Sequence, residues 1–116
     1  MENFKKLNVW LKAHKLVLEV YKATEQFPKA EIFSLISQMK RATISVAANI
    51  AEGSKRKSMK DRKHFLMIAE TSLEELKYYF LLSYELHYIT KENGEILTEK
   101  AREIGRMLNG LSKSIN

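Results

Sequence analysis

The sequence has no cysteine, one proline and four glycines among its 116 residues. Without cysteine, the chain cannot form a disulfide, a thiolate metal site or a thiol nucleophile. Small secreted domains often depend on disulfides, so we expect a cytoplasmic protein. The low proline and glycine content, with 45% hydrophobic and 29% charged residues, is far from disordered, collagen-like or low-complexity compositions. We therefore expect one folded domain over residues 1–116.

Long hydrophobic runs are also absent. The longest uninterrupted apolar stretch is residues 78–82, whereas a helix that crosses a bilayer needs about 20 apolar residues. The N-terminus places Glu2, Lys5 and Lys6 where a signal peptide would need a basic start followed directly by an apolar core. The sequence predicts neither membrane insertion nor export.

Apolar residues recur at helical spacing in four segments, and no segment alternates as a strand would. The predicted helices cover about residues 7–27, 31–52, 58–88 and 91–114. Four helices with short connections favour an all-α, up-down-up-down four-helix bundle.

Local signals mark the ends of these helices. Pro28 ends the first helix, and Gly53 is interpreted as a left-handed cap just past the second. Ser58 and Asp61 have the spacing of a capping box at the start of the third helix, and Thr90 is a candidate cap for the fourth.

Two segments are apolar on every face of their predicted helices. These are residues 78–82 in the third helix and residues 16–18, together with Trp10 and Leu11, in the first. A helix that is apolar all round is normally buried on more than one side. This favours a homo-oligomer, although a generous core with a few exposed aliphatic residues remains an alternative.

The net charge of +6 is confined to one stretch of the chain. Residues 40–63 hold eight bases and two acids, while bases and acids balance in the remainder. Such asymmetry indicates a basic patch. Its members are Lys40, Arg41, Lys55, Arg56, Lys57, Lys60, Arg62 and Lys63.

Most of these bases surround the start of the third predicted helix, where positive charge opposes the helix dipole. A bound phosphate would favour them there. We therefore predict that Lys55, Arg56, Lys57, Lys60, Arg62 and Lys63 contact the backbone of RNA or DNA, with Lys40 and Arg41 as outlying members. No zinc-finger, homeodomain or RNP-like pattern indicates base reading. A solvated basic loop that only aids solubility is the alternative.

Signals for catalysis and metal binding are weak. Asp61 and His64 form the only acid-x-x-His spacing, it is flanked by two cations, and His14 and His87 have no carboxylate three residues earlier. Residues 53–55 invert the Lys-Ser order of a P-loop, and no nucleophile elbow occurs. We expect no metal, no cofactor and no enzymatic activity.

Three polar residues, Ser45, Asn49 and Glu52, share one face of the second predicted helix. Glu52 lies near the C-terminus of that helix, where a carboxylate opposes the helix dipole. Either this face is solvated, or Asn49 and Glu52 reach specific donors across an interhelical or subunit contact. Both readings remain open.

A set of spaced residues extends over essentially the whole chain. The most specific run is Ala-Asn-Ile-Ala-Glu-Gly at residues 48–53. The motif positions, either structural or at an interface, are Trp10, Tyr21, Gln38, Arg41, Ser45, Asn49, Glu52 and Gly53. With this pattern the sequence resembles the small bacterial proteins encoded in intervening sequences of 23S ribosomal RNA.

The resemblance implies an all-helical bundle that assembles into a ring-like homopentamer, with no catalytic residues. It also implies a distant similarity to accessory proteins of diversity-generating retroelements, whose basic surfaces engage reverse transcriptase and nucleic acid. The sequence thus predicts a non-enzymatic homo-oligomer that binds nucleic acid at the hinge between the second and third helices. The alternatives are a scaffold for an acidic protein, such as a reverse transcriptase, and a purely structural oligomer.

Overall fold

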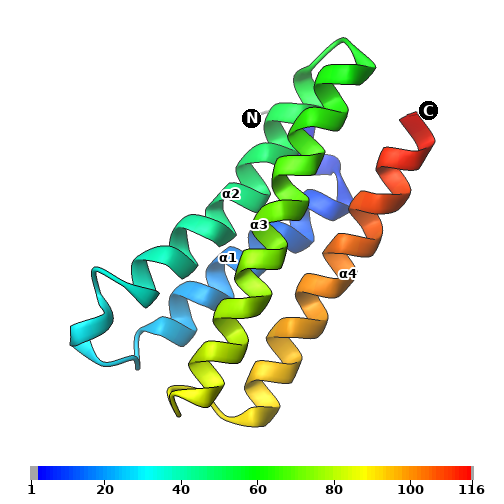
Figure 1. Cartoon of the computed structure of the whole chain (residues 1–116). Helices are drawn as coiled ribbons and strands as arrows, with labels where there is room; N and C mark the ends of the chain where they lie inside the picture. Colours follow the sequence, from blue (N-terminus) through cyan, green and yellow to red (C-terminus); the bar gives the residue numbers. More distant parts are fainter. Residues whose placement is uncertain (1–2, 116) are drawn as a thin grey trace.

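The computed structural model describes residues 3–115, and in this range it contains helices and no strand. Figure 1 shows the four long helices lying side by side. They are α1 (Asn8–Thr24), α2 (Leu35–Lys55), α3 (Met59–Glu85) and α4 (Lys91–Ile115), with short 3-10 helices η1 (Asn3–Lys6) and η2 (Lys29–Glu31). The prediction of an all-α protein with four helices is confirmed.

Each long helix packs against two others. Both α1 and α3 contact α2 and α4, but they do not contact each other in the described part of the chain. They therefore lie diagonally opposite in the bundle. The core fills the space between the four helices, and its largest fully buried apolar side chains are Leu16, Val20, Met39, Val46, Ile50, Leu76, Phe80, Ile104 and Leu108. Each such side chain stabilises the fold by roughly 1.5–3 kcal/mol relative to exposure.

The connection between α1 and α2 is longer than the periodicity predicts. Helix α1 ends at Thr24, and α2 begins at Leu35 rather than at residue 31. Pro28 disfavours a helical residue before it, and only the short η2 turn follows. Ile32 and Phe33, which continue the apolar period in sequence, are exposed in this connection, Phe33 by 95%.

Two predicted caps are present. The Asp61 backbone N–H donates to the hydroxyl of Ser58 over 3.0 Å at the start of α3. The Asn93 backbone N–H donates to the hydroxyl of Thr90 over 3.1 Å at the start of α4. Each satisfies a helix N–H group that has no intrahelical partner.

The interpretation of Gly53 as a left-handed cap is wrong. Gly53 lies inside α2, which continues to Lys55, and no described glycine has a positive φ. A Cβ atom at Gly53 would lie 3.1 Å from the Cβ of Phe65 and 3.6 Å from the carbonyl oxygen of Arg62. The close approach of α3, and not backbone conformation, therefore favours glycine here.

The end of α3 has a strained residue. The N–H of Tyr88 donates to the carbonyl of Ser83 and that of His87 to the carbonyl of Tyr84, both over 2.9 Å, which is the Schellman pattern. His87 occupies its left-handed position, with φ of 66°. Glycine usually holds this position because a Cβ atom there is unfavourable by about 1 kcal/mol.

Side chains link the α1–α2 connection with the α3–α4 connection, which lie at the same end of the bundle. The Tyr88 hydroxyl donates to the Glu31 carboxylate over 2.7 Å, and the rings of Phe27 and Tyr88 lie 5.2 Å apart. Hydrogen bonds from Ser34 and Tyr88 lower the pKa of Glu31. The hydrogen bond between Tyr88 and Glu31 also raises the pKa of Tyr88.

We expect Gly53→Ala to destabilise the protein. Alanine in an open helix position is favoured over glycine by about 1 kcal/mol, but here overpacking against Phe65 costs about 1–3 kcal/mol. Gly110→Ala is the matched control, because nothing lies within 4 Å of its Cβ position, and it should stabilise. Urea unfolding measures both. Equal stabilisation by the two substitutions would contradict the close-approach explanation.

We expect His87→Gly to stabilise the protein by about 1 kcal/mol, because glycine adopts the left-handed conformation without strain. His87→Ala keeps the Cβ atom and should leave stability nearly unchanged. Chemical denaturation at neutral pH measures the two variants. If alanine stabilises as much as glycine, the imidazole ring, and not backbone strain, is the cause.

Candidate nucleic-acid interface

The hinge between α2 and α3 consists of residues 56–58. It lies at the same end of the bundle as the start of α1 and the end of α4 (Figure 1). Six of the predicted contact residues gather in this hinge and the helix turns beside it: Lys55, Arg56, Lys57, Lys60, Arg62 and Lys63. The arrangement concentrates positive charge at one end of the molecule.

The two arginines of the hinge are held by the protein itself. Arg56 donates to the carboxylate of Glu52, and its guanidinium lies 4.9 Å from the ring centroid of Phe65. Arg62 Nε donates to the backbone carbonyl of Arg56 over 2.6 Å. These contacts fix the path of the hinge.

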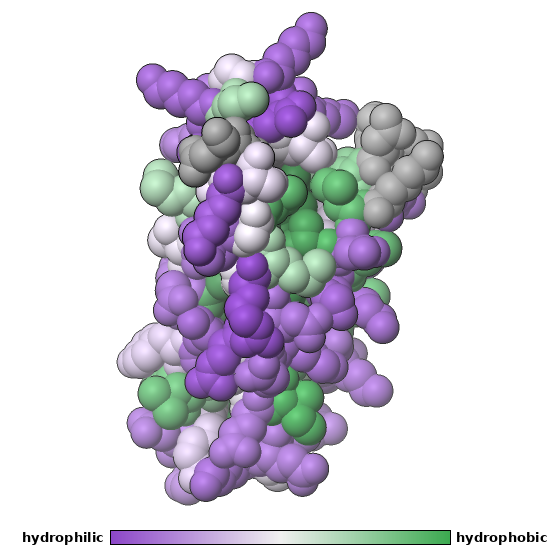
Figure 2. Space-filling view, turned by 90° about the vertical axis from the view of Figure 1, so that its right-hand side faces the viewer, coloured by the Kyte–Doolittle hydropathy of each residue, from purple (hydrophilic) through white to green (hydrophobic). Residues whose placement is uncertain are grey.

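The four lysines, Lys55, Lys57, Lys60 and Lys63, are called the hinge lysines below. Lys55, Lys57 and Lys60 are exposed, and Lys63 is half-buried. Within residues 3–115, no carboxylate forms an ion pair with Lys57, Lys60 or Lys63. Figure 2 shows long hydrophilic side chains projecting from this end of the molecule. The charge of Lys57, Lys60 and Lys63 is therefore available to an external anion.

Lys40 and Arg41 do not join this cluster. Lys40 precedes Lys55 by 15 residues in α2, which is about 22 Å along the helix at 1.5 Å per residue. The ammonium of Lys40 lies 4.4 Å from the ring centroid of Tyr21 on α1. Arg41 instead forms a 2.7 Å ion pair with Glu75 on α3, which raises the pKa of Arg41. Lys40 thus contacts α1, and Arg41 contacts α3.

The motif residues of α2 mostly join it to α3 and to the hinge. Ser72 donates to the hydroxyl of Ser45 over 2.8 Å across the two helices. Asn49 donates to the carbonyl of Ser45, also over 2.8 Å, so it binds its own helix. Glu52 reaches Arg56 in the hinge. The sequence left open whether Asn49 and Glu52 are solvated or reach donors across an interhelical or subunit contact. In the described chain both bind partners in or next to their own helix, and the interhelical hydrogen bond is made by Ser45.

The remaining motif residues lie on α2, near its contact with α3, or on α1. Gln38 accepts from the guanidinium of Arg41 over 3.0 and 3.1 Å. Trp10 stacks on His14 with ring centroids 4.9 Å apart and an interplanar angle of 6°. Tyr21 lies beneath Lys40.

Residues 3–115 bring together no group of three or more histidine or carboxylate side chains that could hold a metal ion. His64 instead lies edge-on to Phe65, with 5.4 Å between ring centroids. In the same part of the chain, none of the helices combines the length and apolar character needed to cross a membrane.

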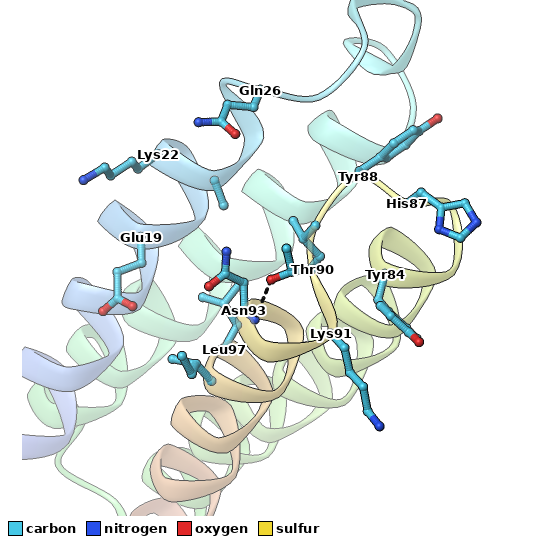
Figure 3. A pocket seen from close by; sticks show the side chains of 13 residues that line it. Glu19, Lys22, Gln26, Tyr84, His87, Tyr88, Thr90, Lys91, Asn93 and Leu97 are labelled. Carbon is cyan, nitrogen blue, oxygen red and sulfur yellow. Dashed lines mark hydrogen bonds between the residues drawn. The ribbon is translucent and has the colours of Figure 1, made fainter.

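A groove at the opposite end of the bundle is a poor ligand site. It is lined by residues of α1 and the segment just after it, the end of α3, the connection between α3 and α4, and α4. Figure 3 shows that Lys22, Gln26, His87 and Lys91 spread outward in different directions. A ligand site needs polar groups that converge.

A second hollow, called the hinge-end pocket below, opens beside the hinge lysines. Its lining comes from α2, α3 and α4 and from the residue before α1, and comprises Leu7, Ile50, Gly53, Ser54, Met59, Arg62, Leu66, Leu111 and Ser114. Sequence analysis did not find it, because these residues are scattered over more than 100 positions and share no local pattern.

Comparisons with known proteins agree with the sequence resemblance. Residues 5–110 match the family model for the 23S rRNA-intervening sequence protein. The chain is also similar to a crystal structure of a protein with unknown function from the S23 ribosomal protein family of Bacteroides thetaiotaomicron. The two share 25% sequence identity and a TM-score of 0.83, over 90% of this chain and 95% of the other. No curated protein matches. The chain therefore belongs to the 23S rRNA-intervening sequence protein family.

Proposed function

We propose that this protein is a non-enzymatic homo-oligomeric bundle that binds the backbone of RNA or DNA through its hinge lysines. The observation that carries the proposal is the placement of Lys57, Lys60 and Lys63 together at one end of the bundle without a carboxylate partner in the described chain. Cations gathered in this way displace the counterions of a phosphate backbone.

The two hinge arginines have a different role in this proposal. Arg56 is engaged by Glu52 and Phe65, and Arg62 by the backbone of Arg56. Both therefore support the surface, and the lysines supply the contacts with phosphate. Ammonium groups on flexible stems bind phosphates as point charges, so we expect salt-sensitive binding with modest sequence preference.

The variant with Lys57, Lys60 and Lys63 all changed to Gln tests this interface. Labelled ribosomal RNA and a DNA duplex are titrated across about 50 to 200 mM salt. For the duplex, the slope of log affinity against log salt should fall by about 0.9 per lysine removed. At about 150 mM salt, binding should be largely lost, because backbone contacts supply most of the affinity.

The matched control removes the same charge at the opposite end of the bundle. Lys22, Lys29 and Lys91 are exposed there, and their change to Gln should leave the salt slope nearly intact. If the two triple variants weaken binding equally, only net charge matters and the interface is misplaced. If the wild type binds neither nucleic acid, the scaffold for an acidic protein becomes the better proposal.

The second part of the proposal concerns assembly. We propose that the chain is an up-down-up-down bundle and that several copies form a ring-like homo-oligomer. The resemblance to the family implies a pentamer. Leu18 on α1 is 56% exposed, and Tyr78 and Leu81 on α3 are 57% and 51% exposed. Because α1 and α3 are diagonal, these are two different apolar faces. A contact between unlike faces is heterologous and closes into a ring when the rotation permits. A ring would also multiply the hinge lysines and so increase avidity.

Charge placed on one apolar face should prevent assembly. We expect Leu18→Glu and, separately, Leu81→Glu to sediment near the 13.5 kDa of one chain, while the wild type sediments near five times this mass. Phe33→Glu is the control, because Phe33 is 95% exposed and lies in the connection between α1 and α2, outside the two helices that carry the faces. A monomeric wild type, or dissociation only by the Phe33 variant, would refute the proposed faces.

A further inference from the structure

The hinge-end pocket has an apolar interior. Ile50 and Leu66 are buried by 99% and 96% of their surface, and Leu7 and Leu111 line the sides. Met59 stands at the mouth and is 64% exposed. The volume is about 390 Å³, within the range of about 300–1,000 Å³ for small-molecule sites. In Figure 2, hydrophobic atoms are exposed directly below the hydrophilic end of the molecule.

One cation, Arg62, is part of the pocket lining, and hinge lysines neighbour other lining residues in the chain. Three residues of its lining, Ser54, Met59 and Arg62, are each followed directly in sequence by a hinge lysine. An apolar cavity with an arginine in its wall and lysines on adjoining residues complements a ligand that joins an apolar group to an anion. Charge complementarity therefore favours one class of occupant. A nucleotide belongs to this class, because it joins a flat base to an anionic phosphate.

We propose that the hinge-end pocket receives one unpaired base of a single-stranded nucleic acid while the hinge lysines bind the flanking phosphates. This inference rests on the proposed function and names its ligand class as single strands or unpaired segments. A base in a duplex must first be unpaired and unstacked, so a duplex should use the lysines alone.

Arg62 is placed to contact the inserted base. Its Nε donates to the carbonyl of Arg56, which holds the guanidinium at the pocket wall. A guanidinium plane stacks on any base.

The serines of the pocket offer little base selectivity. The Ser54 hydroxyl donates to the carbonyl of Ala51, and the Ser114 hydroxyl donates to that of Leu111, both over 2.7 Å. Neither proton is therefore free to read a base edge. We expect insertion of a base with little preference among the four bases.

The experiment compares three forms of one short DNA: the single strand, the same strand with abasic residues, and its duplex. At fixed salt, the wild type should bind the base-containing strand about tenfold more tightly than the abasic strand. Ser54→Trp fills the pocket from its rim and should remove this difference without removing charge. Ser37→Trp, on an exposed position of α2 outside the pocket, should preserve it.

Met59→Ala provides a second variant that leaves the core intact, because Met59 is largely exposed. It should reduce the difference between base-containing and abasic strands. If the wild type binds both strands equally while the triple lysine variant still weakens binding, the pocket inference fails and the proposed function stands. If the lysine variant binds as tightly as the wild type, the proposed function fails and the inference fails with it. Displacement of a pocket-bound hydrophobic dye by an alkyl phosphate, but not by a nucleotide, would assign the pocket to aliphatic ligands and overturn the inference.

Discussion

Phe65 packs against α2 at Gly53, where a Cβ atom would lie only 3.1 Å from that of Phe65. The same ring lies 4.9 Å from the guanidinium of Arg56, so this contact positions the hinge as well as the helices. Farther from the hinge, the hydrogen bond between Ser45 and Ser72 also joins α2 to α3. Small residues permit the approach, and the approach lets three residues connect two long helices. The candidate interface depends on this geometry, because the hinge carries its charge.

Arginine and lysine have divided roles within one basic segment. The planar guanidinium can stack on an aromatic ring and bind a carboxylate or carbonyl at once, and Arg56 and Arg41 make such contacts with Phe65, Glu52 and Glu75. A lysine ammonium is strongly hydrated and keeps to solvent on a flexible stem. At the hinge, equal formal charges therefore hold the structure in the case of Arg56 and Arg62 and form an exposed surface in the case of Lys57 and Lys60. The net charge alone does not distinguish them.

The ends and the sides of the bundle offer different surfaces to partners. At the hinge end, the helices leave an apolar pocket next to cations. Along the sides, α1 and α3 expose leucine and tyrosine side chains at diagonal corners. Association through the sides would leave the hinge end open. A ring and a nucleic-acid interface are thus compatible in one molecule.

The sequence predicts the helical class, the caps at Ser58 and Thr90, and the segment that carries the net charge, because periodicity, capping and composition are local properties. It misjudged Gly53, whose role depends on Phe65 twelve residues away across the hinge. Tertiary structure decided the partners of Lys40 and Arg41, because Tyr21 and Glu75 lie on other helices that pack against α2. It also created the hinge-end pocket from the ends of separate helices. Contacts between distant segments depend on packing, which no local pattern in the chain encodes.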